Sequence, residues 1–193
     1  LNLAIHARTG LVVFNGPTLM TDLAEYPRPL AYTREYLLKA LTRPEPVGTV
    51  EPAQAWTDEF IDWGSEADQS RVRTLRPASG WDWARPGRGA GRLMGGCLES
   101  LEHLRGTLYW PNFESALLFL ETSEEKPSPA HVDAVLMDYE NMGVLERING
   151  LLFGRPYGYT EEERRKLRAV ILERTARYSF PVVLDMDFGH TSP

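Results

Sequence analysis

In the second half of the chain, short apolar runs alternate with amphipathic segments, and this alternation limits the fold more than any other feature. After Gly95-Gly96 and a helical pattern at 97–104, the expected elements are a strand at 116–121, a helix at 129–142, a strand at 150–153, a helix at 161–178 and a strand at 181–186. Right-handed crossovers connect strands that alternate with helices, so neighbouring strands run parallel. We therefore predict an α/β fold with a partly parallel sheet.

Two of these helices begin with recognisable first turns. Ser128 precedes Pro129, which suits the N-cap and the first helical position. Thr160 and Glu163 have the spacing of a capping box, in which each satisfies an unpaired backbone amide. These signals set the predicted helix starts at 129 and 161.

The first 91 residues are less regular. They contain the end of a helix at 1–9, a strand at 11–14, a helix at 33–41, a Pro- and Gly-rich linker at 44–52, and short strands with long loops at 53–91. A helix without its start predicts that the chain is an excerpt of a longer protein. We expect residues 1–45 to be a remnant of an N-terminal domain with its linker, and residues 46–193 to form the C-terminal domain.

Composition excludes several classes of protein. A formal net charge of −6 argues against a nucleic-acid partner, because binding phosphates requires clustered Lys and Arg. The sequence has no apolar run near the ~18 residues of a membrane span, so we expect no membrane association. Cys97 is the only cysteine, which rules out an internal disulfide and a multi-thiolate metal site. A single cysteine also favours the reducing cytoplasm.

Two polar residues follow the ends of predicted strands. Glu121 ends one apolar run, and His190 lies four residues after another. Parallel strands bring their carboxyl ends to one edge, where ligands bind in open α/β sheets. An imidazole serves as a general base near neutral pH, and a carboxylate fixes its tautomer. The alternative is that both are surface residues, as we expect for the Glu124-Glu125-Lys126 charge run.

The sequence offers no clear nucleophile to accompany this pair. No serine lies in a Gly-x-Ser-x-Gly turn between a strand and a helix, and Ser65 lies in a charged loop. Cys97 begins a helix after two glycines, where the helix dipole favours a thiolate, although a small packed residue explains it better. We expect the missing nucleophile to lie upstream of Leu1.

Other residues allow further interpretations. Asp185, Asp187 and His190 offer hard metal ligands within six residues, but His6, His103 and His131 all lie in helical contexts. Gly95 and Gly96 offer backbone amides to an anion, or else close helix packing. Trp110 and the Trp-rich segment at 53–91 offer an aromatic wall to a ligand, or else core and dimer contacts.

Several ordered motifs together resemble one family. They are the runs at 14–17, 95–99, 106–111, 118–121, 154–156 and 187–190. They are similar to the LD-carboxypeptidase family of serine peptidases, and within it to the microcin C immunity branch. The resemblance implies a Ser-Glu-His triad with Glu121 as the acid and His190 as the base. It also implies that a flavodoxin-like N-terminal domain supplies the serine.

The resemblance implies a serine carboxypeptidase that needs no cofactor. Its substrate is then a small peptide with a murein L,D bond, or a peptidyl-nucleotide amide. Cys97 departs from the Gly-Gly-Asn of the murein enzymes, which favours the nucleotide branch. We expect a cytoplasmic homodimer in which Gly95, Gly96 and Trp110 contact substrate. The alternatives are a non-catalytic binding module and a metal-dependent hydrolase.

Overall fold

A computed structural model describes all residues, 1–193, and divides them into two compact units. The sheet unit comprises Leu1–Phe14 and Trp81–His190, and the loop unit comprises Asn15–Gly80 and Thr191–Pro193. The division into domains at residues 45 and 46 stays a prediction.

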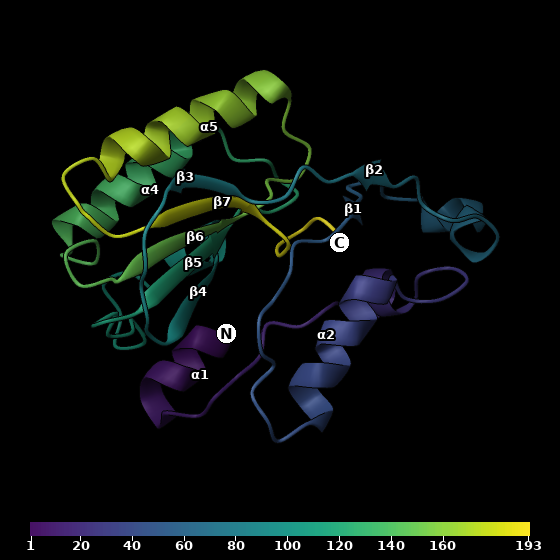
Figure 1. Cartoon of the computed structure of the whole chain (residues 1–193), viewed down its shortest axis with the longest axis horizontal. Helices are drawn as coiled ribbons and strands as arrows, with labels where there is room; N and C mark the ends of the chain where they lie inside the picture. The colour runs from purple at the N-terminus through teal and green to yellow at the C-terminus, as the bar shows by residue number, and fades with distance from the viewer. The chain divides into compact units, whose positions relative to one another are not determined.

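The sheet unit is built on five strands in the order β3-β7-β6-β5-β4. They are β3 (Asp82–Arg85), β4 (Leu93–Cys97), β5 (Leu117–Glu121), β6 (Gly150–Gly154) and β7 (Val182–Met186). Strands β4 to β7 are parallel neighbours in chain order, whereas β3 pairs with β7 in antiparallel fashion (Figure 1). The predicted α/β fold with a partly parallel sheet is therefore confirmed.

The helices of this unit are α1 (Asn2–Thr9), α3 (Leu98–Glu102), α4 (Pro129–Asn141) and α5 (Glu161–Arg174). Figure 1 shows α4 and α5 side by side along one face of the sheet. The Ser128 cap and the Thr160 capping box are both present. Helix α5 ends four residues before the predicted end, because the Thr175 hydroxyl donates to Ile171 O and the Tyr178 amide closes a turn onto Thr175 O.

The core lies between the sheet and these helices. Alternate strand residues such as Leu118 and Leu120 of β5 are completely buried, as are Val132, Leu136 and Tyr139 of α4. This alternation follows from the two-residue period of a strand, which points successive side chains to opposite faces. Residues of the other face are half-buried in β5, and Leu93 at the start of β4 is exposed.

Residues 87–91, which we call the strap, connect β3 to β4 across the amino ends of the strands between them. A Cβ on Gly89 would lie 2.2 Å from the carbonyl oxygen of Asn149, just before β6. A Cβ on Gly91 would lie 2.0 Å from the carbonyl oxygen of Ser115, two residues before β5. Only glycine allows a backbone this close to another backbone, so the strap passes directly against the sheet edge.

Residues 11–14 differ from expectation, because they form no strand. Helix α1 ends as predicted at Gly10, whose φ of +71° is left-handed and whose amide donates to His6 O. Beyond it Leu11, Val12 and Phe14 are exposed, and no strand pairs with them. Strand propensity alone does not make a strand when no neighbouring strand accepts its hydrogen bonds.

The loop unit has little regular structure. It contains α2 (Ala31–Thr42), the short antiparallel strands β1 (Ala55–Trp56) and β2 (Arg76–Pro77), and the helical turns η1 (Leu19–Leu23), η2 (Trp63–Ser65) and η3 (Ala67–Gln69). The predicted helix at 33–41 is thus confirmed, and so are the short strands and long loops. Arg73 Nε donates to Glu25 Oε2 at 2.6 Å, and Thr57 forms a bridge to Ser192.

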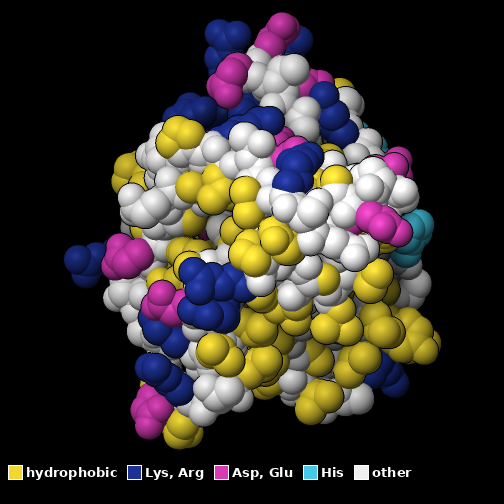
Figure 2. All heavy atoms as spheres, turned by 90° about the vertical axis from the view of Figure 1, so that its right-hand side faces the viewer, with side chains coloured by type: hydrophobic (Ala, Val, Ile, Leu, Met, Phe, Trp, Pro, Cys, Tyr) yellow, Lys and Arg dark blue, Asp and Glu magenta, His cyan; other side chains and the backbone are white.

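Many large hydrophobic side chains of the loop unit are exposed, among them Met20, Leu41 and Phe60. Figure 2 shows hydrophobic side chains gathered over the lower part of one face. Exposed apolar areas of this kind are typical of surfaces that contact another protein segment. No helix of the chain combines the length and the apolar character needed to cross a membrane.

Candidate active site

Glu121 and His190 meet at the carboxyl edge of the sheet, as their positions in the sequence predict. Glu121 is the last residue of β5, and His190 follows β7 by four residues. The two are 69 residues apart in the chain, yet His190 Nδ1 lies 2.6 Å from Glu121 Oε2. The histidine side chain is 35% exposed and the glutamate 15%, so the imidazole remains accessible while its partner is largely covered.

The turn after β7 brings His190 back over the sheet. The Phe188 amide donates to Met186 O at 2.9 Å. The Phe188 ring packs edge-on against the Phe119 ring, with the two centroids 5.8 Å apart. Gly154 lies beneath this turn, where a Cβ would come within 2.5 Å of Phe188 O. Gly189 has a φ of +108°, a conformation that L side chains rarely adopt. The turn therefore depends on two glycines.

Carboxylates face the imidazole on both of its nitrogens. The hydrogen bond to Glu121 raises the pKa of His190 above its ordinary value, although partial burial acts in the opposite direction. The charges of Glu124 and Glu99 add to the rise, and Glu124 Oε2 lies 3.0 Å from Nε2. The sequence interpretation missed Glu124, because it assigned the charge run to solvent. Its position three residues after Glu121 was the available signal.

The thiol of Cys97 lies close to the carboxylates of Glu99 and Glu121. Cys97 ends β4 and pairs in register with Glu121. Burial raises the pKa of its thiol, and the charges of Glu99 and Glu121 raise it further. Since the thiolate is the nucleophilic form, this environment disfavours Cys97 as a nucleophile. Burial raises the pKa of Glu99, but hydrogen bonds from the Ser123 hydroxyl and amide outweigh it and leave that pKa lowered.

The other predicted contact residues have structural surroundings of their own. Gly95 and Gly96 belong to β4 and do not form a turn before a helix. A Cβ on Gly95 would lie 1.7 Å from Phe119 O, so this glycine lets β4 approach β5. The Trp110 ring packs edge-on against two other rings, with its centroid 5.4 Å from that of Phe113 and 5.5 Å from that of Tyr139. A role of these residues in substrate binding stays a prediction.

The carboxylates proposed as metal ligands are paired with arginines. Asp185 Oδ1 lies 2.9 Å from Arg164 Nη1, and Asp187 Oδ1 lies 2.8 Å from Arg155 Nη2. No group of three or more His, Cys, Asp or Glu side chains is arranged to hold a metal ion. This geometry favours the paired acid and base at Glu121 and His190 over a metal centre.

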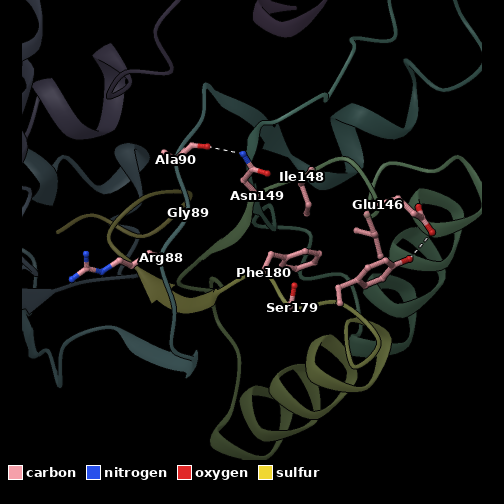
Figure 3. A pocket seen from close by; sticks show the side chains of 10 residues that line it. Arg88, Gly89, Ala90, Glu146, Ile148, Asn149, Ser179 and Phe180 are labelled. Carbon is pink, nitrogen blue, oxygen red and sulfur yellow. Dashed lines mark hydrogen bonds between the residues drawn. The ribbon is translucent and has the colours of Figure 1, made fainter.

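A hollow of about 460 Å³ lies at the opposite, amino edge of the sheet (Figure 3). Asn149, just before β6, and Phe180, just before β7, both line it. Asn149 Nδ2 donates to Ala90 O at 2.8 Å. The Phe180 ring stacks on the Tyr178 ring, with the two centroids 5.4 Å apart. The hollow therefore belongs to the strap region and is separate from Glu121 and His190, which lie at the carboxyl edge.

Comparison with known sequences defines the class of this protein. Residues 90–193 match the LD-carboxypeptidase C-terminal domain, and the chain belongs to this family, which is of the serine peptidase type. The predicted resemblance is thereby confirmed.

Individual relatives extend this comparison to the whole chain. The putative carboxypeptidase YocD of Bacillus subtilis is 28% identical over 193 residues, covering 98% of this chain and 56% of the relative. The microcin C7 self-immunity protein MccF of Escherichia coli is 26% identical over 196 residues, covering 98% and 55%. The chain thus spans about half the length of the curated relatives it matches.

Solved structures agree with this assignment. The structure of MccF in complex with glutamyl sulfamoyl guanosine aligns with a TM-score of 0.81 at 27% identity, covering all of this chain and 57% of the other. The fold is therefore that of the MccF and LD-carboxypeptidase proteins.

Proposed function

We propose that this chain supplies the acid and the base of a Ser-Glu-His triad in a serine hydrolase of the LD-carboxypeptidase type. The serine then comes from a segment upstream of Leu1. The observation that carries the proposal is the 2.6 Å contact between His190 Nδ1 and Glu121 Oε2 at the carboxyl edge of the sheet. Membership of a serine peptidase family supports it independently.

The chemistry follows from the orientation of the imidazole. Glu121 accepts a hydrogen bond from Nδ1–H of His190, which leaves Nε2 unprotonated and able to act as the base. Nε2 takes the proton of the serine hydroxyl while the serine oxygen attacks the amide carbonyl carbon. The imidazolium then gives this proton to the departing amine, and an acyl-enzyme remains. Water hydrolyses the acyl-enzyme with His190 again as the base. Glu124 must move from its place 3.0 Å from Nε2 before the hydroxyl can enter.

The substrate we favour is an amide between an amino acid or peptide and a nucleotide-like group. The solved complex of MccF with glutamyl sulfamoyl guanosine supports this class. Cys97, in place of the asparagine expected of murein enzymes, supports it as well. A murein L,D-peptide is the second candidate, because another relative, from Bacillus subtilis, is named a probable murein peptide carboxypeptidase.

The test uses the intact protein, including the segment upstream of Leu1. It is assayed with an aminoacyl sulfamoyl nucleoside and with a murein L,D-tetrapeptide. We expect hydrolysis of the nucleoside, and loss of about 10³-fold or more in kcat on His190→Ala, since triad members act as a unit. His103→Ala, at the exposed end of α3, is the matched control and should retain activity.

Four results would overturn the proposal. Retention of more than a tenth of wild-type turnover by His190→Ala would remove the base from the mechanism. Inhibition by a chelator without inhibition by serine-directed reagents would indicate a metal hydrolase. Binding of the nucleoside without turnover would indicate a binding module. The 193-residue chain by itself should hydrolyse neither substrate, and turnover by it would reveal a nucleophile within the chain.

A further inference from the structure

A buried ion pair lies next to the turn that carries His190. Asp187, three residues before the histidine, has its Oδ1 2.8 Å from Arg155 Nη2. Both side chains are almost completely buried, at 2% and 4% exposure. The second carboxylate oxygen, Oδ2, accepts a hydrogen bond from Trp81 Nε1 at 2.7 Å. The Asp187 carboxylate is therefore held from two directions. We call Trp81, Arg155 and Asp187 the clamp.

The clamp joins three elements of the sheet unit. Trp81 lies just before β3, Arg155 just after β6, and Asp187 just after β7. The Arg155 backbone amide donates to Met186 O at 2.9 Å, and its Nη2 donates to Asp185 O at 3.2 Å. The end of β7 is thus fixed by both the backbone and the side chain of Arg155.

All three clamp residues belong to the second segment of the sheet unit. The sheet unit begins its second segment at Trp81 and ends at His190. Trp81 is therefore the first residue after the chain leaves the loop unit, and His190 is the last residue before the chain returns to it.

Stability alone is a weak reason for such an arrangement. Taking two charges out of water costs several kcal/mol per ion, and apolar residues of similar volume are often at least as stable. A fixed pair of charges does specify direction, however. The turn from Asp187 to His190 runs through Gly189, the residue type with the widest conformational freedom. Such a turn needs a fixed starting point if the imidazole is to meet Glu121 within hydrogen-bonding distance.

We propose that the clamp is a positioning device for His190. Asp187, Arg155 and Trp81 touch no reacting atom, and they act by holding the turn so that Nδ1 faces Glu121 and Nε2 faces the reacting groups. The kinetic part of this inference rests on the proposed function, whereas the positioning of the imidazole does not. A displacement of about 1 Å at a reacting group can cost about 10²-fold in rate.

The principal variant is Trp81→Phe, which keeps an aromatic ring but removes the Nε1 donor together with the second ring of the indole. Asp187→Asn is the second variant, and it removes the charge while keeping the shape. Trp83→Phe, at an exposed tryptophan two residues along β3, is the control for the first. Asp185→Asn, which breaks the ion pair with Arg164, is the control for the second.

The first readout is the pKa of His190, measured by NMR on the 193-residue chain without any assay of activity. We expect both clamp variants to lower it toward 6.5, because a displaced imidazole loses the Glu121 hydrogen bond that raises it. The two controls should leave it unchanged. The second readout is kinetic and uses the intact protein, in which we expect kcat to fall by about 10- to 100-fold with little change in KM.

The outcomes separate the two claims. If the clamp variants lower the melting temperature but leave the His190 pKa at its wild-type value, the clamp only stabilises the fold and the inference is wrong. If Asp187→Asn does not fold, Trp81→Phe still decides the question. If the intact wild-type protein hydrolyses no substrate, the proposed function fails, and the NMR titration still tests the positioning of His190.

Discussion

Gly189 packs directly against the side chain of Glu121. A Cβ on Gly189 would lie 2.8 Å from Glu121 Oε2 and 3.1 Å from Glu121 Cβ. The residue that precedes the candidate base therefore also limits where its carboxylate partner can lie. Glycine serves two purposes here, because it allows the φ of +108° and leaves room for Glu121.

The first prediction concerns Gly189→Ala. The added methyl group should displace the Glu121 carboxylate and weaken its hydrogen bond to His190, so the pKa of His190 should fall toward 6.5. In the intact protein kcat should fall as well. NMR titration of the histidine and steady-state kinetics measure these two effects.

The matched control for this prediction is Gly158→Ala. Gly158 also has a positive φ, at +65°, but a Cβ there would meet only Lys126 Cδ at 3.9 Å. Both variants carry backbone strain, and only Gly189→Ala disturbs Glu121. An equal His190 pKa in the two variants would contradict the prediction.

The second prediction concerns Glu124→Gln. Its carboxylate lies 3.0 Å from His190 Nε2 and contributes to the raised pKa of the imidazole. Loss of this negative charge should lower the pKa of His190 and shift the acid limb of the kcat/KM profile to lower pH. Glu125→Gln, at the next residue along the chain, is the control. The backbone amide of Glu125 donates to the Ser123 hydroxyl. Identical titration curves of His190 in the two variants would show that the Glu124 carboxylate does not interact with Nε2 in solution.

The third prediction concerns the pH dependence of stability. The pKa of His190 is raised in the folded state. Its ionic contact with Glu121 therefore stabilises the fold fully below the unfolded-state pKa, and this contribution is lost as pH rises through the folded-state pKa. Urea unfolding should thus show a larger loss of stability on His190→Asn at pH 5.5 than at pH 8.5. In a Glu121→Gln background the same comparison should show a smaller difference between the two pH values.

The fourth prediction concerns the strap. Gly89→Ala and Gly91→Ala place a methyl group at 2.2 and 2.0 Å from a backbone carbonyl oxygen, which the fold cannot accommodate without moving the strap. Each should destabilise the chain by about 1–3 kcal/mol, the usual cost of overpacking. Gly87→Ala should cost less, because its Cβ would meet Pro181 Cβ at 3.3 Å. Similar urea midpoints for all three variants would contradict this account.

The local elements were predictable because their signals lie within a few residues. The cap at Ser128 and the capping box of Thr160 and Glu163 fix helix starts by contacts over three residues. The alternation of strands and helices gave the parallel order of β4 to β7, because crossover handedness restricts the topologies. Where a strand needed a distant partner, as at residues 11–14, local propensity gave the wrong answer.

The sequence by itself determined which strand ends carry Glu121 and His190, because the carboxyl ends of parallel strands share one edge of the sheet. Only the tertiary structure decided that Glu124 faces Nε2 and that Asp187 meets Trp81, which is 106 residues away. Periodicity specifies which face or edge a residue occupies, whereas the distance between two side chains depends on how separate segments pack. That packing, through the close approaches at Gly154 and Gly189, brings the candidate acid and base together.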